Sequence, residues 1–176
     1  MTHRVLVAFD ESPQARAALG FALDAFPDAG VVVLHVNDPR EWELGDGVNY
    51  GYYSQEEFER AQDSAEELLA EARALAAEQD REIETATETG TVSDAIVGYA
   101  EARDVDHVVI GSHGRTGLTR FLLGSVAETV ARRAPTSVTI IREDEDGSGN
   151  EDGSKDEDRS KNEDGSKNED GSEGAA

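Results

Sequence analysis

The chain alternates between short apolar runs and longer stretches with helical periodicity, and this alternation constrains the fold more than any other feature. Four runs are rich in β-branched residues and four to six residues long, as expected of strands covered on both faces: residues 5–9, 31–36, 107–110 and 138–141. Residues 83–87 alternate more weakly and are expected to form an edge strand. Apolar residues recur at helical spacing in the four intervening segments: residues 19–26, 61–76, 92–99 and 126–134.

Strict alternation of this kind predicts an α/β fold of three layers, with a five-stranded parallel sheet between helices. Ser12 followed by Pro13 predicts the start of the first helix, because serine is a preferred N-cap and proline is favoured at the first helical position. In such sheets ligands bind beyond the carboxyl ends of the strands, where the strand order reverses. The residues directly after strands are therefore the first candidates for a site.

Acidic side chains outnumber basic ones, and the net charge of the 176 residues is −23. Residues 143–176 carry 14 acids and 4 bases, and four hexads similar to NEDGSK fill residues 150–173 without one apolar side chain. Such a segment cannot bury apolar surface, so we expect a disordered, solvating tail or, as the alternative, a partner-binding arm. The folded domain is predicted to end at residue 142, and its 12 bases are all arginines.

An acid-coated, lysine-free domain argues against nucleic acid and anionic membranes as partners, because both are bound through summed cationic contacts. No stretch approaches the roughly 20 apolar residues of a membrane span, and an aspartate interrupts the first apolar run before a signal peptide could form. We therefore expect a cytoplasmic protein. The absence of cysteine excludes disulfides and thiolate chemistry. The carboxylate surplus favours a halophilic, archaeal source, in which it keeps the surface hydrated.

The segment GSHGRTGLTRFLLGS, residues 111–125, directly follows the fourth apolar run. Three of its glycines could turn exposed N–H groups toward one spot: Gly111, Gly114 and Gly124. Ser125 with Glu128 three positions later is a capping-box pattern, which predicts that Ser125 caps the last helix. A helix N-terminus favours anions. On these grounds alone the segment is either a phosphate-binding turn or a plain tight connection.

The spacing G-x2-G-x9-G-S in this segment resembles the nucleotide-binding motif of the universal stress protein (UspA-like) family, in its ATP-binding branch. RVLVAFDESPQARAAL resembles the family's first strand and acidic turn, VVVLHVND its second strand, and LLGSVAETVARRAPTSVTIIR its last helix and strand. The resemblance covers residues 3–142. It implies a Rossmann-like fold of the HUP type with strand order 3-2-1-4-5.

The resemblance also implies a binding site for ATP or another adenine nucleotide, accompanied by Mg²⁺ held through phosphate oxygens rather than by a protein cage. In ATP-binding members the loop glycines, the hydroxyl residue and the following amide contact phosphates and ribose. The aspartate after the first strand contacts the nucleoside, and the backbone at the end of the second strand faces adenine. The implied contact residues are Asp10, Val36, Gly111, Gly114, Gly124, Ser125 and Val126.

Several of these residues also have simpler explanations. Asp10 could serve only to cap the first helix together with Ser12. His35 is expected to be a packed strand histidine rather than a metal ligand. His113 is expected in solvent, and the two loop arginines, Arg115 and Arg120, could reach phosphates or be ordinary surface charge. The aromatic connection, residues 37–54, could cover the adenine, pack at a subunit contact or form a small local core.

The function expected first is a non-catalytic nucleotide-binding regulator in the stress response. The family commonly dimerises through the last strand, and residues 137–142 would leave an apolar edge unpaired in a lone subunit. The alternative is an ATP-hydrolysing or nucleotidyl-transferring enzyme, with slow ATPase activity left open. A lysine-free domain cannot supply the P-loop lysine. A third alternative, a phosphate-accepting receiver domain on Asp10, lacks its lysine as well.

Overall fold

The computed structural model describes residues 3–40, 55–112 and 123–142. These residues form five parallel strands in the order β3-β2-β1-β4-β5, as the sequence predicted. Helices alternate with strands along the chain: β1 (Arg4–Ala8), α1 (Pro13–Ala25), β2 (Gly30–Asn37), α2 (Gln55–Ala77), β3 (Glu84–Thr89), α3 (Val92–Ala102), β4 (His107–Gly111), α4 (Ser125–Arg133) and β5 (Ser137–Ile141).

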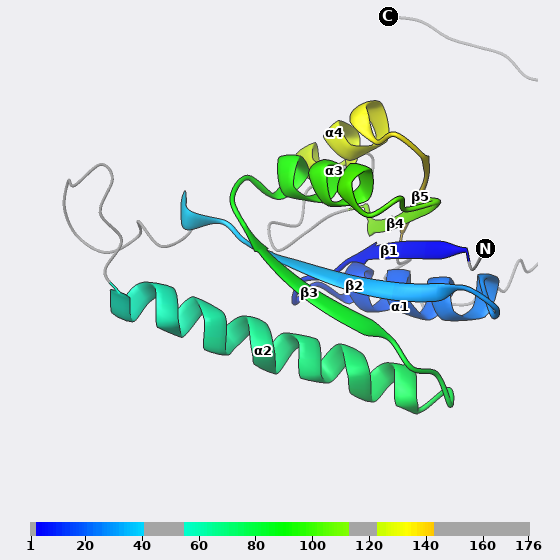
Figure 1. Ribbon diagram of the computed structural model, residues 1–176, viewed down its shortest axis with the longest axis horizontal. Helices are drawn as coiled ribbons and strands as arrows, with labels where there is room; N and C mark the ends of the chain where they lie inside the picture. The colour runs from blue at the N-terminus through cyan, green and yellow to red at the C-terminus, as the bar shows by residue number, and fades with distance from the viewer. Residues whose placement is uncertain (1–2, 41–54, 113–122, 143–176) are drawn as a thin grey trace, which may run out of the picture. The chain divides into compact units, whose positions relative to one another are not determined.

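Different pairs of helices cover the two faces of the sheet (Figure 1). Alternate residues of β1 enter opposite layers: Val5 and Val7 pack with α1 and α2, whereas Leu6 packs with α3 and α4. β2 alternates in the same way. Because β1, β2 and β4 are buried on both faces, their sequences are continuous apolar runs rather than alternating ones.

The two outer strands, β3 and β5, are less buried. β3 carries only partly buried or exposed residues, which explains its weak sequence pattern and confirms the predicted edge strand. β5 has the same apolar composition as the central strands, but it also lies at an edge and its side chains are half-buried. The β5 side chains therefore cover both layers without being enclosed by them.

The turn from β1 into α1 is held by a small hydrogen-bond network. Ser12 is the N-cap, and its Oγ accepts the Ala15 N–H at 3.2 Å, with Pro13 at the first helical position as predicted. Asp10 Oδ1 in turn accepts the backbone N–H of Ser12 at 3.0 Å and the Ser12 hydroxyl proton. This network fixes the direction in which the chain leaves the sheet.

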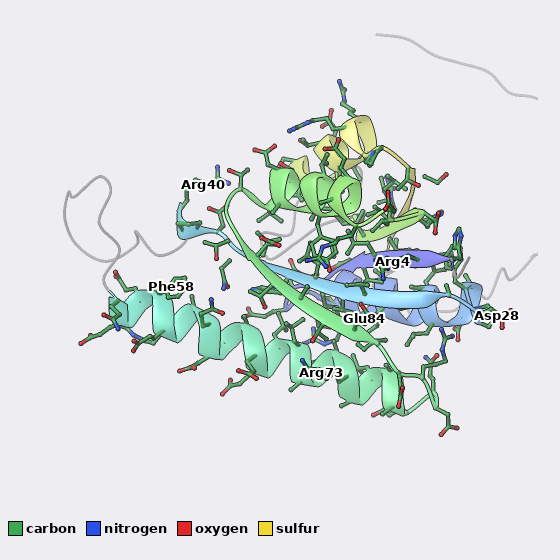
Figure 2. The ribbon with its side chains drawn as sticks, viewed as in Figure 1. Arg4, Asp28, Arg40, Phe58, Arg73 and Glu84 are labelled. Atoms are coloured by element: carbon green, nitrogen blue, oxygen red, sulfur yellow. The ribbon has the colours of Figure 1, made fainter. Side chains whose placement is uncertain are left out.

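Arginines join the helices to other elements. Arg73 on α2 donates to Thr85 of β3 (Figure 2). Arg81 donates to three carbonyls that follow or end α1, those of Leu23, Phe26 and Ala29. One guanidinium can satisfy several acceptors because it has five donors in a fixed plane. Some arginines of the domain therefore stabilise contacts between elements of the fold.

Gly111, at the end of β4, has no room for a side chain. A Cβ there would lie 2.9 Å from Gln14 Cβ and 3.1 Å from the Gln14 carbonyl carbon. The first turn of α1 packs directly against this strand end. A backbone atom cannot move aside as a side-chain tip can, so α1 and β4 must pack through a glycine.

We predict that Gly111→Ala lowers the free energy of unfolding by about 1–3 kcal/mol, the usual cost of overpacking. Denaturant unfolding measures it. Gly98→Ala is the matched control, because Gly98 is a helical glycine in α3 and a Cβ added to it would have nothing within 4 Å. That control should stabilise by about 0.5–1 kcal/mol. Equal effects of the two substitutions would contradict the packing argument.

The environment of His107, at the start of β4, leads to a prediction of how the free energy of unfolding depends on pH. Its Nε2 lies 2.8 Å from Thr139 Oγ1 and its ring packs against Phe26, with ring centroids 4.9 Å apart. Burial lowers the pKa of His107 below its ordinary value of 6.5, and the charge of His3 lowers this pKa further. Protonation of His107 therefore favours the unfolded chain.

As the pH falls from 6.5 toward the lowered folded pKa of His107, we expect stability to be lost, because the unfolded chain binds more protons in this window. The contribution of neutral His107 to stability is fully present above pH 6.5. Thermal unfolding from pH 7.5 to pH 5 measures the loss, and His107→Gln, which keeps a hydrogen-bonding amide near Thr139, should show a smaller one. Parallel curves for the two proteins would refute this assignment.

Candidate functional site

β1 ends before its two neighbours, and this defines the edge at which polar groups gather. Its last paired residues are Ala8, opposite Leu34 of β2, and Val7, opposite Val109 of β4. β2 continues to Asn37 and β4 to Gly111. The order of the strands reverses between β1 and β4, so this switch-point edge is where parallel α/β sheets bind ligands.

Asp10 lies at the switch-point edge, half-buried, two residues after β1. Both explanations considered from the sequence bear on it. Its Oδ1 is used by the Ser12 cap, as the simpler explanation required. No described residue donates a hydrogen bond to Oδ2. The capping network therefore holds the carboxylate in place and leaves one oxygen for another donor.

The backbone of Val36 faces the same edge. The Leu34 carbonyl accepts the Phe9 N–H at 2.9 Å on the β1 side, and the Asn37 carbonyl accepts the Gly90 N–H at 2.9 Å after β3. Backbone groups of successive strand residues point to opposite sides, so Val36 directs its N–H and C=O toward β1. Since β1 has already ended there, neither group meets a strand partner. The Val36 side chain is buried on the other side, among α3 and α4.

α4 begins one residue earlier than the capping-box pattern predicted. Gly124 is the N-cap, with φ −62° and ψ 145°, and no side chain caps the helix. The Gly124 N–H donates to the Ser112 carbonyl at 2.8 Å, and the Gly124 carbonyl accepts the Glu128 N–H at 2.9 Å. This return contact with the end of β4 fixes Gly124 as the last non-helical residue. The prediction that Ser125 caps the helix is therefore wrong.

Because no side chain caps α4, three backbone N–H donors at its start have no acceptor among the described residues. These are the N–H groups of Ser125, Val126 and Ala127, which precede the first intrahelical bond of α4. Ser125 is exposed, so its hydroxyl is accessible as well. Together with the partial positive charge of a helix N-terminus, these groups suit an anion.

Two of the predicted glycines, Gly111 and Gly124, have structural roles other than exposing backbone amides to a ligand. The Gly124 N–H is already donated to Ser112, which removes it from the donors expected for a ligand. Gly111 is required by the close approach of α1, whatever else it contacts. Gly114 lies outside the described residues, as do His113, Arg115, Arg120 and most of the aromatic connection. The described anion donors come from the helix start rather than from glycines.

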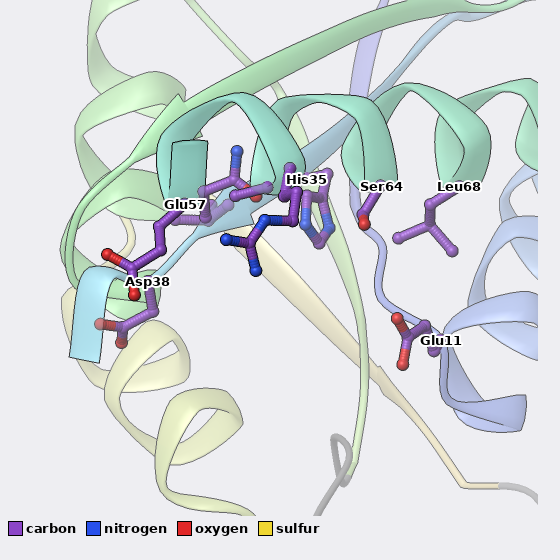
Figure 3. A pocket seen from close by; sticks show the side chains of 10 residues that line it. Glu11, His35, Asp38, Glu57, Ser64 and Leu68 are labelled. Atoms are coloured by element: carbon purple, nitrogen blue, oxygen red, sulfur yellow. The ribbon is translucent and has the colours of Figure 1, made fainter. Parts of the chain in front are cut away.

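A cavity of about 310 Å³ lies between the end of β2 and the first half of α2 (Figure 3). Its walls include His35, Val36 and Asn37 from β2 and Ala61, Ser64 and Leu68 from α2. Glu11, the neighbour of Asp10, lines it too. The cavity therefore adjoins the switch-point edge and shares Val36 with it.

His35 is a buried strand histidine, as predicted, with 4% of its surface exposed. Its Nδ1 lies 2.9 Å from the Phe9 carbonyl oxygen. A carbonyl can only accept, so Nδ1 carries the proton of this hydrogen bond, and in the neutral ring Nε2 is an acceptor. His35 is thereby oriented by the backbone at the end of β1.

Asn37 was not singled out from the sequence, although it is the most unusual residue of the cavity. It is 6% exposed, and its Nδ2 finds no hydrogen-bond partner among the described residues. Its backbone carbonyl, in contrast, is paired with Gly90. The available signal was a polar residue ending the apolar run VVVLHV at the carboxyl end of a strand.

Charged groups around the cavity are mostly acidic. Asp38 is buried and receives several hydrogen bonds from Arg40, which lower the pKa of this carboxyl below its ordinary value. Glu11 and Glu57 also line the cavity, against one lining cation, Arg60. This balance disfavours an anionic group inside the cavity and is compatible with a neutral one.

Within the described ranges, no three acidic or histidine side chains cluster in a way that could hold a metal ion. In the same part of the chain, no helix has the length and apolar character that crossing a membrane requires.

The chain up to residue 142 is similar to known proteins. The model of the universal stress protein family matches residues 1–142. A universal stress protein of Mycolicibacterium smegmatis is 36% identical over 143 residues, which cover 78% of this chain and 45% of that protein, so the chain spans less than half of this relative. A putative universal stress protein of Staphylococcus epidermidis is 30% identical over 80% of this chain and 84% of its own length.

Solved structures agree with this assignment. A hypothetical protein whose biochemical function was assigned from its structure is 28% identical, with a TM-score of 0.67 over 83% of this chain and 99% of its own. A universal stress protein in complex with cAMP is 26% identical, with a TM-score of 0.58 over 79% and 96%. An Arabidopsis thaliana family protein with AMP bound is 18% identical and shares the fold, with a TM-score of 0.58 over 85% and 97%. The chain belongs to the universal stress protein family.

Proposed function

We propose that this chain is a cytoplasmic, dimeric regulator of the stress response that binds ATP or another adenine nucleotide with Mg²⁺ and does not turn it over. The observation that carries the proposal is the set of unpaired polar groups at the switch-point edge. Among the described residues, Asp10 Oδ2 and the first amides of α4 lie after strand ends of this edge, and the Val36 backbone lies near the end of β2 where β1 no longer pairs with it. The family relative in complex with cAMP supports the adenine nucleotide class.

Each group suits one part of a nucleotide. The amides of Ser125 and Val126 would donate to phosphate oxygens at the positive end of the α4 dipole. Asp10 Oδ2 would accept a ribose hydroxyl, and the Val36 N–H and C=O offer one donor and one acceptor to the base. Two strand spacings separate β2 from β4, about 10 Å, which a nucleotide spans from base to phosphates.

The acidic surface does not prevent polyphosphate binding. Exposed charges are screened beyond about 8 Å at physiological salt and beyond about 3 Å at molar salt, which favours binding in the salt-rich cytosol that we propose as the source. Hydrogen bonds to charged groups contribute about 1.5–3 kcal/mol each. Three or four such bonds can supply the roughly 8 kcal/mol of micromolar affinity.

Two features favour binding over turnover. The domain before residue 143 contains no lysine, and Asp10 is committed through Oδ1 to the Ser12 cap, which lowers its freedom to act as a mobile base. A phosphoryl-transfer site needs a positioned base and a charge clamp. Hydrolysis of radiolabelled ATP on the time scale of nucleotide exchange, abolished by Asp10→Asn, would support the enzyme instead.

We predict that Ser125→Ala lowers ATP affinity about fivefold to tenfold, the effect of one hydrogen bond, without lowering stability. Stability is spared because the Ser125 hydroxyl does not cap α4, whereas the loss of a true cap costs about 1 kcal/mol. Titration calorimetry in molar KCl and thermal unfolding measure the two effects. Ser93→Ala, in the first turn of α3, is the control and should change neither.

Absence of any heat on titrating ATP, ADP or AMP into the folded wild-type protein would overturn the proposed function. Unchanged affinity in Ser125→Ala, with wild-type binding intact, would remove only the role of its hydroxyl. These two results are separable because the first concerns the whole site and the second one side chain.

Dimerisation through β5 makes a further prediction. The Ile141 carbonyl accepts the Ser112 N–H on the β4 side, so the alternate residue Val138 directs its N–H to the outer edge. Val138→Pro removes that donor at an edge where proline is tolerated, and it should shift a dimer toward monomer in light scattering at molar KCl. Val138→Ala keeps the N–H and should remain dimeric. A monomeric wild-type protein would contradict this proposal.

A further inference from the structure

The cavity of about 310 Å³ between β2 and α2, called the α2 cavity below, contains a polar side chain that is not fully hydrogen-bonded within the described residues. Asn37 is 6% exposed, lines the cavity and has an Nδ2 without a hydrogen-bond partner among the described residues. Leaving a buried donor unpaired costs free energy, and an apolar residue of similar shape would avoid that cost. A buried polar group that the fold leaves unpaired indicates a ligand that pairs with it.

The geometry points to a base-reading role: we propose that the Asn37 carboxamide recognises the donor–acceptor edge of the nucleotide base inside the α2 cavity. This inference rests on the proposed function and extends it to a residue outside the glycine motif and its strand-end aspartate. A carboxamide presents a donor and an acceptor side by side in one plane. Asparagine pairs in this bidentate manner with adenine, whose exocyclic amine lies beside a ring nitrogen.

The walls of the cavity suit a flat, uncharged group. Ala61 and Leu68 provide apolar contacts, and a volume of about 310 Å³ can hold a purine base. Asp38 is paired with Arg40, and Glu11 and Glu57 outnumber Arg60 among the described lining residues, which disfavours a phosphate or carboxylate there.

His35 adds a second acceptor to the cavity. Its Nδ1–H is donated to the Phe9 carbonyl, so Nε2 of the neutral ring accepts. A ligand with an exocyclic amine offers two protons, one for the Asn37 carbonyl oxygen and one for a further acceptor. The lining residue Val36 also belongs to the switch-point edge, so the base can enter the cavity while the phosphates reach α4.

The test is a cycle of two proteins and two ligands. ATP is compared with purine riboside triphosphate, which lacks only the 6-amino group, by calorimetry on the full chain in molar KCl. We expect the wild-type protein to prefer ATP about tenfold. In Asn37→Ala the preference should fall about threefold, mainly through weaker ATP binding, because His35 can still accept from the amine.

Thr89→Ala is the matched control, because Thr89 lies opposite Asn37 in the β2–β3 register, is exposed and does not line the cavity. It should keep the tenfold preference. Asn37→Leu, which has a similar shape, is the second variant. Its melting temperature without ligand should equal or exceed that of the wild-type protein, because no hydrogen bond is lost.

An unchanged ATP preference in Asn37→Ala, with both nucleotides still bound, would overturn the role of Asn37 and leave the proposed function standing. A lower melting temperature of ligand-free Asn37→Leu would also overturn it, because Asn37 would then serve the fold. If the wild-type protein bound neither nucleotide, the proposed function and this inference would both fail.

Discussion

The early end of β1 is the constraint on which the site depends. β1 is the central strand, buried on both faces, and its neighbours β2 and β4 both continue after its pairing stops. For this reason the backbone of Val36 finds no partner in the described part of the chain, and Asp10 enters the space as the chain turns toward α1. The site is therefore a consequence of strand lengths in a parallel sheet, before any particular side chain is considered.

The described donors of the edge are backbone amides rather than cationic side chains. This choice fits a domain in which acids outnumber arginines two to one and lysine is absent. An arginine placed at the site would meet many competing carboxylates, whereas an amide at the start of α4 cannot be neutralised by a neighbouring acid. Under the proposed function, oriented amides would give a strongly acidic protein a local anion preference that the net charge does not reveal.

The sequence predicted the sheet well because the central strands are buried on both faces and alternate with periodic helices. It predicted the start of α1 correctly because Ser12 and Pro13 act locally. It failed by one residue at α4, since Gly124 is fixed by its hydrogen bond to Ser112, a contact that no local pattern encodes. Gly111 was attributed to a phosphate-binding turn or a tight connection, because the close contact of Gln14 with the end of β4 is visible only in three dimensions.

Asn37 was missed for a related reason, since a single polar residue at a strand end does not show whether its side chain is paired. The same distinction, between polar groups that have a hydrogen-bond partner and those that do not, bears on the proposed ligand. The described residues use Asp10 Oδ1, the Gly124 N–H and the Asn37 backbone carbonyl, and they leave Asp10 Oδ2, the first α4 amides and Asn37 Nδ2 without partners. The unused donors at α4 suit an acceptor-rich anion, whereas the carboxamide suits a neutral partner with both a donor and an acceptor. A molecule that joins a polyanion to a heteroaromatic base meets both requirements, and neither phosphate nor a free base does so alone.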